Sequence, residues 1–446
     1  MEPLFSNKDL KKLIVPLVFE QALAITVGMA DTMMISSVGE AAVSGVSLVD
    51  MINILMFNIM AALATGGAVV TSQFLGARQK DKARKSAKQL LYTVIFAGAL
   101  LGLASILARK PMLRLFFGSI EADVMENALV YLTISAFSFP FLAVYNACAA
   151  LFRSMGNSQV TLKVSVLINL INVTGNAICI YGLHMGAAGV AIPSLISRAV
   201  GSIILYILLK NPALDICFLR EPVRLDFDMV KKILYIGIPS GVENGIFQLG
   251  RILVVSIISS FGTVQIAANG VANNLDSLGI LVGNAINLAM ITVIGQCVGA
   301  GDESQVRLYT KKLLVITYIP TIILNITLFL NLNWILGLYG LSTETTQLAR
   351  TLIFIHNGFA CLLWPLSFTL PNMLRACNDV RYTMVVSIAS MFIFRIGFSY
   401  LIGMQLGYGA VGVWIAMVLD WICRVTCFIL RYVRGKWKSL AGIADT

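Results

Sequence analysis

Apolar runs of about twenty residues, separated by short polar stretches, recur along the whole chain. Each run is long enough to cross a bilayer as a helix, because a helix rises about 1.5 Å per residue. The pattern predicts an all-α polytopic membrane protein with twelve transmembrane helices. The predicted spans are 12–36, 46–72, 87–108, 127–150, 161–182, 186–209, 231–260, 267–297, 311–332, 351–374, 383–403 and 409–431.

Composition and charge agree with a chain that lies mostly in lipid. Of the 446 residues, 58% are hydrophobic and 12% are charged, whereas soluble domains average about 25% charged residues. The net charge of +11 would suit a nucleic-acid partner, but the Lys and Arg residues concentrate in alternate short loops, as the positive-inside rule requires. We therefore expect no nucleic-acid binding, two cytoplasmic termini and a location in the cell membrane, plasma or inner.

No sequence pattern indicates an enzyme. The chain contains no P-loop, no GxSxG and no HExxH motif. The eight cysteines are scattered without a CxxC pair and are expected to be packing residues, so we expect neither a cofactor nor a resident metal. His184 and His356 are isolated; a structural role fits both, and a place in a proton relay also fits His356.

The chain repeats itself at a constant offset of 223 residues, the distance from Pro16 to Pro239. Six spans in each half give both halves the same orientation in the membrane. We predict two pseudo-symmetric six-helix lobes, 1–209 and 231–446, joined by a cytoplasmic linker at 210–230 and arranged around a central cavity. Such lobes suit a transporter that works by alternating access. Further matching pairs are Glu20 with Glu243, Gly39 with Gly262, Gln73 with Gln296 and Arg84 with Arg307.

Acidic side chains interrupt the apolar spans. Glu20 and Asp31 are eleven residues apart and lie on one face of the first span. A carboxylate near the bilayer centre costs about 3 kcal/mol, so it indicates a function. Glu20 is duplicated at Glu243, whereas Asp31 corresponds to Val254. Glu20 and Glu243 either face a cavity or lie in water near the cytoplasmic ends of their helices.

A second set of polar residues is also duplicated. Asp50 matches Asn273, and Asn53 matches Asp276. The first two share one face near the outer part of the second span. These residues either line the cavity or its outer gate, or form hydrogen bonds between helices.

Several stretches resemble the multidrug and toxic compound extrusion (MATE) transporters. They are ADTMMISSVGEAAVSGVS (30–47), SQFLGARQKDKAR (72–84), LFRSMGNSQ (151–159), YIGIPSGVE (235–243) and GAVGVWIAMVLDWICR (409–424). The resemblance implies a cation-coupled antiporter that exports amphipathic, often cationic organic compounds in exchange for H+ or Na+. Its partners would be small organic substrates, the coupling cation and the lipid bilayer, and the chain is expected to be monomeric.

The resemblance also implies a cation-coupling site in the N-terminal lobe. The family's first-helix acid maps to Asp31, its fifth-helix polar pair to Asn172 and Asn176, and its sixth-helix hydroxyl to Ser194. Carboxylate, amide and hydroxyl oxygens suit a hard cation such as Na+, and a carboxylate partly removed from water can instead carry a proton. The two asparagines could alternatively only bridge helices.

Two departures from the family pattern concern the C-terminal lobe. Some branches carry one acid in the seventh helix and another in the tenth; here those positions are Phe247 and Trp364. We therefore expect coupling in the N-terminal lobe. Rival interpretations are a lipid-linked oligosaccharide flippase of the same superfamily, for which extra spans and a strongly cationic cavity would be typical, and a channel.

Overall fold

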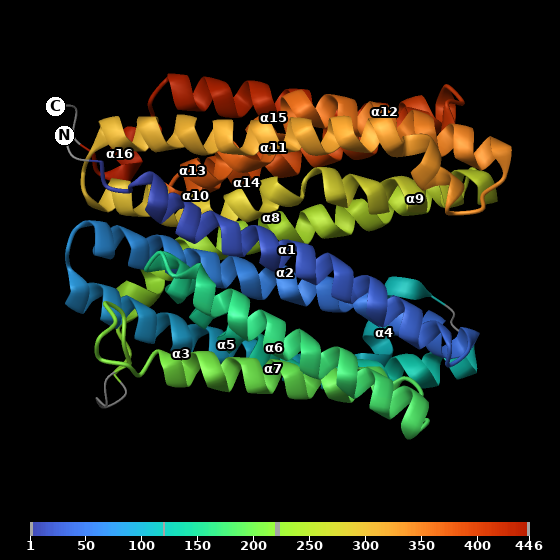
Figure 1. Cartoon of the computed structure of the whole chain (residues 1–446), viewed down its shortest axis with the longest axis horizontal. Helices are drawn as coiled ribbons and strands as arrows, with labels where there is room; N and C mark the ends of the chain where they lie inside the picture. Colours follow the sequence, from blue (N-terminus) through green and yellow to red (C-terminus); the bar gives the residue numbers. More distant parts are fainter. Residues whose placement is uncertain (1–2, 119–120, 219–223, 444–446) are drawn as a thin grey trace. The chain divides into compact units, whose positions relative to one another are not determined.

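The computed structural model describes residues 3–118, 121–218 and 224–443, and all regular structure in these ranges is helical (Figure 1). The elements are α1 (Asn7–Ser36), α2 (Glu40–Gly76), α3 (Lys80–Leu107), α4 (Arg109–Phe117), α5 (Ala122–Ser154), α6 (Ser158–Ala177), η1 (Ile178–Gly182), α7 (Ala188–Leu208), α8 (Phe227–Ser259), α9 (Thr263–Gly279), α10 (Leu281–Gly299), α11 (Glu303–Gly337), α12 (Thr343–Trp364), η2 (Pro365–Thr369), α13 (Leu370–Ala376), α14 (Val380–Ser390), η3 (Met391–Gly397), η4 (Ser399–Gln405), α15 (Gly409–Val433) and α16 (Trp437–Ala441). The η elements are π-helical segments.

Twelve helical stretches in the described part of the chain are long and apolar enough to cross a bilayer. This confirms the predicted number of spans and the all-α class. One difference lies at the predicted span 267–297, which is divided at Ile280 into α9 and α10. The break falls where Asn325 of α11 donates a hydrogen bond to the carbonyl of Gly279, at 3.4 Å. A Cβ on Gly279 would lie 2.5 Å from the amide oxygen of Asn325, so a larger residue there would displace this side chain.

Helix α3 shows how the chain places its polar side chains. Its most exposed large side chains are Phe96, Leu100, Leu103 and Leu107, which recur at helical spacing. Its buried face carries Ser86 and Gln89 together with small residues and a few aliphatic ones, Leu90 among them. Large apolar side chains on the exposed face suit a lipid surround, and the polar side chains lie inside the protein.

The chain forms two compact units. The N-terminal unit is Phe5–Gly241, and the C-terminal unit is Val242–Thr446 together with Met1–Leu4. The boundary therefore falls inside α8. The predicted linker lies in the N-terminal unit, except for residues 219–223, which are outside the described residues. In that unit α5 is central and packs against α2, α3 and α7 (Figure 1).

Residues on both sides of the undescribed stretch 219–223 contact the start of α3. Lys80 forms an ion pair with Asp215 at 2.5 Å, and Lys85 forms one with Asp226. The Lys85 ammonium and the backbone amide of Met229 hold the pKa of Asp226 below its usual value. Gln89 donates to the carbonyl of Arg224 at 2.7 Å. These residues are therefore fastened to the N-terminal unit by charge-assisted hydrogen bonds.

The repeat is visible in the local backbone conformation of both units. Residues with positive φ occupy repeat-related positions, and most are glycines, which adopt this conformation without strain. Asn378, where the first copy has Gly156, is a residue type that tolerates it. The related pairs are Gly39 (132°) and Gly262 (105°), Arg78 (59°) and Gly301 (70°), Gly156 (74°) and Asn378 (66°), and Gly186 (62°) and Gly409 (58°). The two halves thus share their turns as well as their helices.

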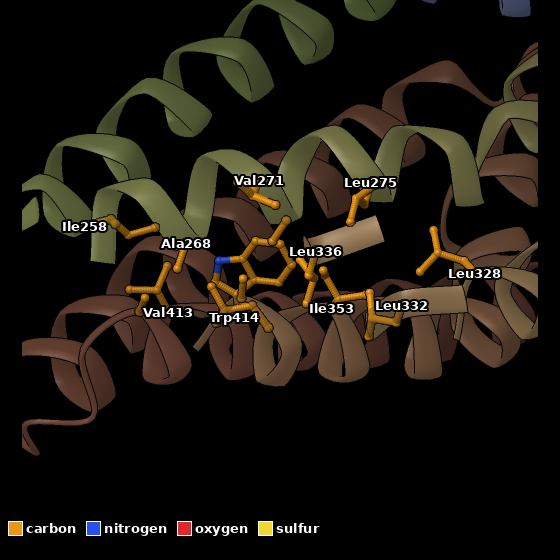
Figure 2. Close-up of a cluster of buried hydrophobic side chains, with 14 residues drawn as sticks. Ile258, Ala268, Val271, Leu275, Leu328, Leu332, Leu336, Ile353, Val413 and Trp414 are labelled. Carbon is orange, nitrogen blue, oxygen red and sulfur yellow. The ribbon is translucent and has the colours of Figure 1, made fainter. Parts of the chain in front are cut away.

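The C-terminal unit has an apolar core around Trp414 of α15 (Figure 2). The labelled neighbours of this ring include Val271, Leu336 and Ile353, from three other helices. The indole nitrogen of Trp414 donates to the amide oxygen of Asn269 at 2.9 Å. A buried indole N–H needs such a partner, so this hydrogen bond fixes the ring orientation in the core.

The short helix α16 is held against the start of α11. Lys438 forms an ion pair with Glu303 at 2.8 Å. The guanidinium of Arg307 lies over the rings of Tyr432 and Trp437, at 5.8 and 5.7 Å from their centroids. These contacts combine charge pairing with cation–π attraction. Helix α16 is thus part of the C-terminal unit.

Helices α2 and α8 approach closely within the N-terminal unit. A Cβ on Gly66 would lie 2.5 Å from the carbonyl oxygen of Ile233, whereas a Cβ on Gly241 would meet only Ala62 at 3.8 Å. Small residues at such crossings allow backbones to approach in membranes. The contact therefore depends on Gly66 and tolerates a side chain at Gly241.

We expect Gly66→Ala to destabilise the protein by about 1–3 kcal/mol, because the new methyl group overlaps backbone atoms that cannot rotate away. Gly241→Ala is the matched control and should change stability by less than about 1 kcal/mol. Thermal unfolding of the two purified variants in one detergent measures the difference. Equal midpoints would contradict the assigned helix contact.

Candidate functional site

The four residues predicted to bind the coupling cation lie in one chain of hydrogen bonds in the N-terminal unit. The amide nitrogen of Asn176 donates to Oδ1 of Asp31 at 2.8 Å and to Oδ1 of Asn172 at 3.3 Å. Asn172 in turn donates to Oγ of Ser194 at 2.9 Å. The chain therefore runs from α1 through α6 to α7.

Helical spacing explains this arrangement. Asn172 and Asn176 are four residues apart on α6, so their amides lie on the same face and contact each other. Ser194 lies next to Pro193 in α7, and its hydroxyl group donates to the carbonyl of Val190 at 3.0 Å. The structure brings the four residues together, and their role in coupling remains a prediction.

One oxygen atom in this hydrogen-bond chain accepts no hydrogen bond. Asn176 is fully buried, and its Oδ1 has no hydrogen-bond partner among the described residues. An unpaired buried acceptor costs about 1–3 kcal/mol, so it is rarely left without a ligand. An amide oxygen beside a carboxylate can coordinate Na+ or accept a hydrogen bond from a protonated group. Asp31 is half-buried, so the site is not sealed.

A second polar network lies deeper in the same unit. Oδ1 of Asp50 accepts from the hydroxyl group of Tyr131 at 2.9 Å and from Asn53 at 3.3 Å. Asn53 also lies 3.3 Å from the hydroxyl of Ser135, to which it donates. Asp50 and Asn53 therefore form hydrogen bonds to α5, one of the two roles considered for them. Tyr131 could not be predicted from the sequence, because a single tyrosine in an apolar span is common.

Arg198 connects the two networks electrostatically. Its guanidinium donates to the hydroxyl of Ser138 at 2.6 Å and attracts both Asp31 and Asp50. Two carboxylates and one guanidinium leave one negative charge when the acids are ionised. This part of the N-terminal unit therefore carries a net negative charge when both acids are ionised.

The repeat-related acids Glu20 and Glu243 have different surroundings. Glu20 is half-buried and accepts one hydrogen bond from Thr161 at 3.2 Å. Glu243 is buried and forms an ion pair with Arg375 at 2.7 Å. Glu243 is therefore not exposed to water, and its counter-ion is supplied by α13.

We expect Glu243→Gln to destabilise the protein by about 3–5 kcal/mol, because it leaves the largely buried Arg375 without a counter-ion. Glu20→Gln, the repeat-related control, should cost less than about 1 kcal/mol, because it alters a single half-exposed hydrogen bond. Unfolding of both variants in detergent tests this. A Glu20 variant as unstable as the Glu243 variant would contradict it.

Asn273 and Asp276 exchange the order of acid and amide relative to Asp50 and Asn53. Asp276 is buried and lies 3.2 Å from Nδ1 of His356, which also contacts Oδ1 of Asn357 at 2.9 Å. The side chain of Asn273 is half-buried. His356, one of the two isolated histidines, is thus placed beside an acid.

The two positions that carry acids in some MATE branches are packed with aromatic rings. Phe247 and Trp364 both contact Phe368, with ring centroids 6.0 and 5.3 Å apart. Asp420 of α15 is fully buried nearby, between Arg395 at 3.1 Å and Arg424 at 3.2 Å. No sequence pattern predicted this cluster, because Arg395 of η3 meets Asp420 and Arg424 of α15 only through packing.

Twelve apolar helices in two repeats, with buried charges inside each unit, define a membrane transport protein. The sequence profile of the MatE family matches residues 16–178 and 239–401, the two halves at the same offset of 223 residues. The chain belongs to this family of multidrug efflux transporters.

Relatives and solved structures agree over nearly the whole chain. A "Probable multidrug resistance protein NorM" of Thermotoga maritima is 24% identical, over 98% of this chain and 94% of the relative. An "Uncharacterized transporter YisQ" of Bacillus subtilis is 27% identical, over 95% and 92%. The fold is shared with a structure described as "Outward-facing conformation of a multidrug resistance MATE family transporter of the MOP superfamily", at 19% identity and a TM-score of 0.89, covering 98% of this chain and 96% of that chain.

Proposed function

We propose that the protein is a cation-coupled antiporter, which exports amphipathic, often cationic organic compounds in exchange for H+ or Na+. Asp31, Asn172, Asn176 and Ser194 hold the coupling cation. The observation that carries this proposal is the hydrogen-bond chain from Asp31 to Ser194, with the unpaired buried oxygen of Asn176 beside the carboxylate. The names of the relatives, multidrug resistance proteins, support the substrate class.

In this mechanism Asp31 alternates between a bare and a cation-bound carboxylate. Binding of one cation neutralises the single excess negative charge of Asp31, Asp50 and Arg198. The site is neutral with the cation bound and negatively charged without it, and burying it costs more free energy in the charged form. Cation binding therefore shifts the equilibrium between two conformations that bury the site to different extents. Alternating access follows when the organic substrate prefers the conformation that the cation disfavours.

The driving force is sufficient for concentrative export. One cation that moves inward down a 100 mV potential releases about 2.3 kcal/mol, which supports an outward substrate gradient of roughly fifty-fold. This direction requires the protein to lie in the cell membrane. We propose that it does so as a monomer, with both termini in the cytoplasm.

Asp31→Asn should abolish cation-driven export, a loss of at least about tenfold, because the neutral amide cannot exchange a charge. The measurement is efflux of a fluorescent organic cation from proteoliposomes under a pH gradient or a Na+ gradient, each imposed separately. Asp228→Asn, an exposed residue in the first turn of α8, is the control and should be unaffected. Normal export by the Asp31 variant would exclude this carboxylate as the coupling group, and the gradient that drives the wild type identifies the ion.

Asn176→Leu should raise the concentration of coupling cation needed for half-maximal export by at least about tenfold. The substitution removes both the donor to Asp31 and the unpaired oxygen, worth a few kcal/mol together. Asn169→Leu is the matched control on α6, since Asn169 contacts Ser165 instead. If both variants show the same cation dependence as the wild type, Asn176 has only a structural role.

A further inference from the structure

The C-terminal unit contains a buried charge cluster with more cations than anions. Asp420 is shared by Arg395 and Arg424, at 3.1 and 3.2 Å. Glu243 is paired with Arg375 at 2.7 Å and is also attracted by Arg424. Three guanidinium groups therefore face two carboxylates. The positive excess is local to Arg395 and Arg424, whose side chains are 8% and 3% exposed.

The other charged groups near the cluster do not cancel this excess. Asp276 contacts His356 and is attracted by Arg251. Arg251 follows Glu243 on α8, about two helical turns further along. Counting Asp276 and Arg251 as well gives four guanidinium groups and three carboxylates. A buried charge without a counter-ion costs several kcal/mol, so an excess of one is not a neutral feature of a core.

Aromatic faces offer part of the compensation. Arg395 and Arg424 lie 5.1 and 5.4 Å from the ring centroid of Phe247, and Arg424 lies 5.1 Å from that of Phe368. A ring quadrupole attracts a cation but carries no net charge. The rings hold the two guanidinium groups in place and leave the excess charge available to an anion.

The local backbone is irregular at the same place. Phe368 lies in the π-helical segment η2 and Arg395 in η3. Such segments are uncommon and occur often at functional sites. The indole N–H of Trp421, which is 1% exposed and packs on Phe368, has no hydrogen-bond acceptor among the described residues. A free donor beside excess positive charge suits a negatively charged ligand.

We propose that Arg395 and Arg424 form an anion-binding site in the C-terminal unit, which takes the carboxylate group of an aromatic organic acid. The paired guanidinium groups match a carboxylate, and the rings of Phe247, Phe368 and Trp421 match an aromatic frame. An inorganic halide has the same charge and is the other source of a suitable anion. Export of such an acid by this protein rests on the export function proposed above. Binding of the acid at Arg395 and Arg424 does not depend on that function.

The test is isothermal titration calorimetry on the purified full-length protein, with sodium benzoate, sodium chloride and benzamide as separate ligands. Each titration is run at the same constant, saturating Na+ concentration, so that Na+ binding near Asp31 contributes no heat. Binding of benzoate without binding of benzamide supports the anion site. Competition by chloride at similar concentrations assigns the site to inorganic anions, and its absence assigns it to organic acids. No binding of benzoate, or equal binding of benzamide, would overturn the proposal.

Two substitutions change the local charge in opposite directions. Arg424→Gln leaves Asp420 paired with Arg395 alone and should weaken benzoate binding at least about tenfold. Asp420→Asn raises the positive excess and should strengthen binding. Arg434→Gln, the same change at an exposed arginine just beyond α15, is the control. Unchanged or weaker binding by a folded Asp420 variant contradicts the site. Should neither variant fold, the wild-type titration decides, and equal binding of benzoate and benzamide contradicts the site.

The benzoate titration and the export assay test the anion site and the coupling site separately. Export by proteoliposomes is measured with a cationic dye and does not require benzoate. Export that depends on Asp31 without any binding of benzoate would exclude the anion site alone. Binding of benzoate in a protein that exports nothing would leave the anion site and exclude the antiport.

Discussion

A charge inside an apolar helix bundle must find its partner within the protein, because lipid offers none. This constraint explains most of the polar contacts of the spans. Asp50 is held by Tyr131 and Asn53, and Glu243 is held by Arg375. Helix α3 shows the same rule along one element, with leucines on its exposed face and Ser86 and Gln89 on its buried face.

Within that rule, a number of buried polar atoms in the described residues still lack a hydrogen-bond partner, and two of them lie beside a net charge. The amide oxygen of Asn176 is such a group in the N-terminal unit, beside a net negative charge. The indole N–H of Trp421 is its counterpart in the C-terminal unit, beside a net positive charge. The two units share spans and turns, but they differ in their buried charged side chains and in the π-helical segments η2 and η3 of the C-terminal unit. The two proposed sites are therefore of opposite charge.

Much of the fold was predictable because lipid imposes a strong and simple pattern. Span length follows from bilayer thickness, and the repeat is visible as matching glycines such as Gly39 and Gly262, which share a positive φ. The division at Ile280 was not predictable, since it depends on Asn325 of another helix. The same holds for the boundary between the units inside α8, which no change of composition marks.

The sequence by itself determined the class of protein, the number of spans, the duplication and the group of Asp31, Asn172, Asn176 and Ser194. These follow from hydropathy, from spacing within one helix and from resemblance, all of which are local along the chain. Only the tertiary structure decided which charges meet: Glu243 with Arg375, Arg198 with the two acids, and Asp420 with Arg395 and Arg424. Pairing across helices depends on their packing, and sequence spacing does not encode it.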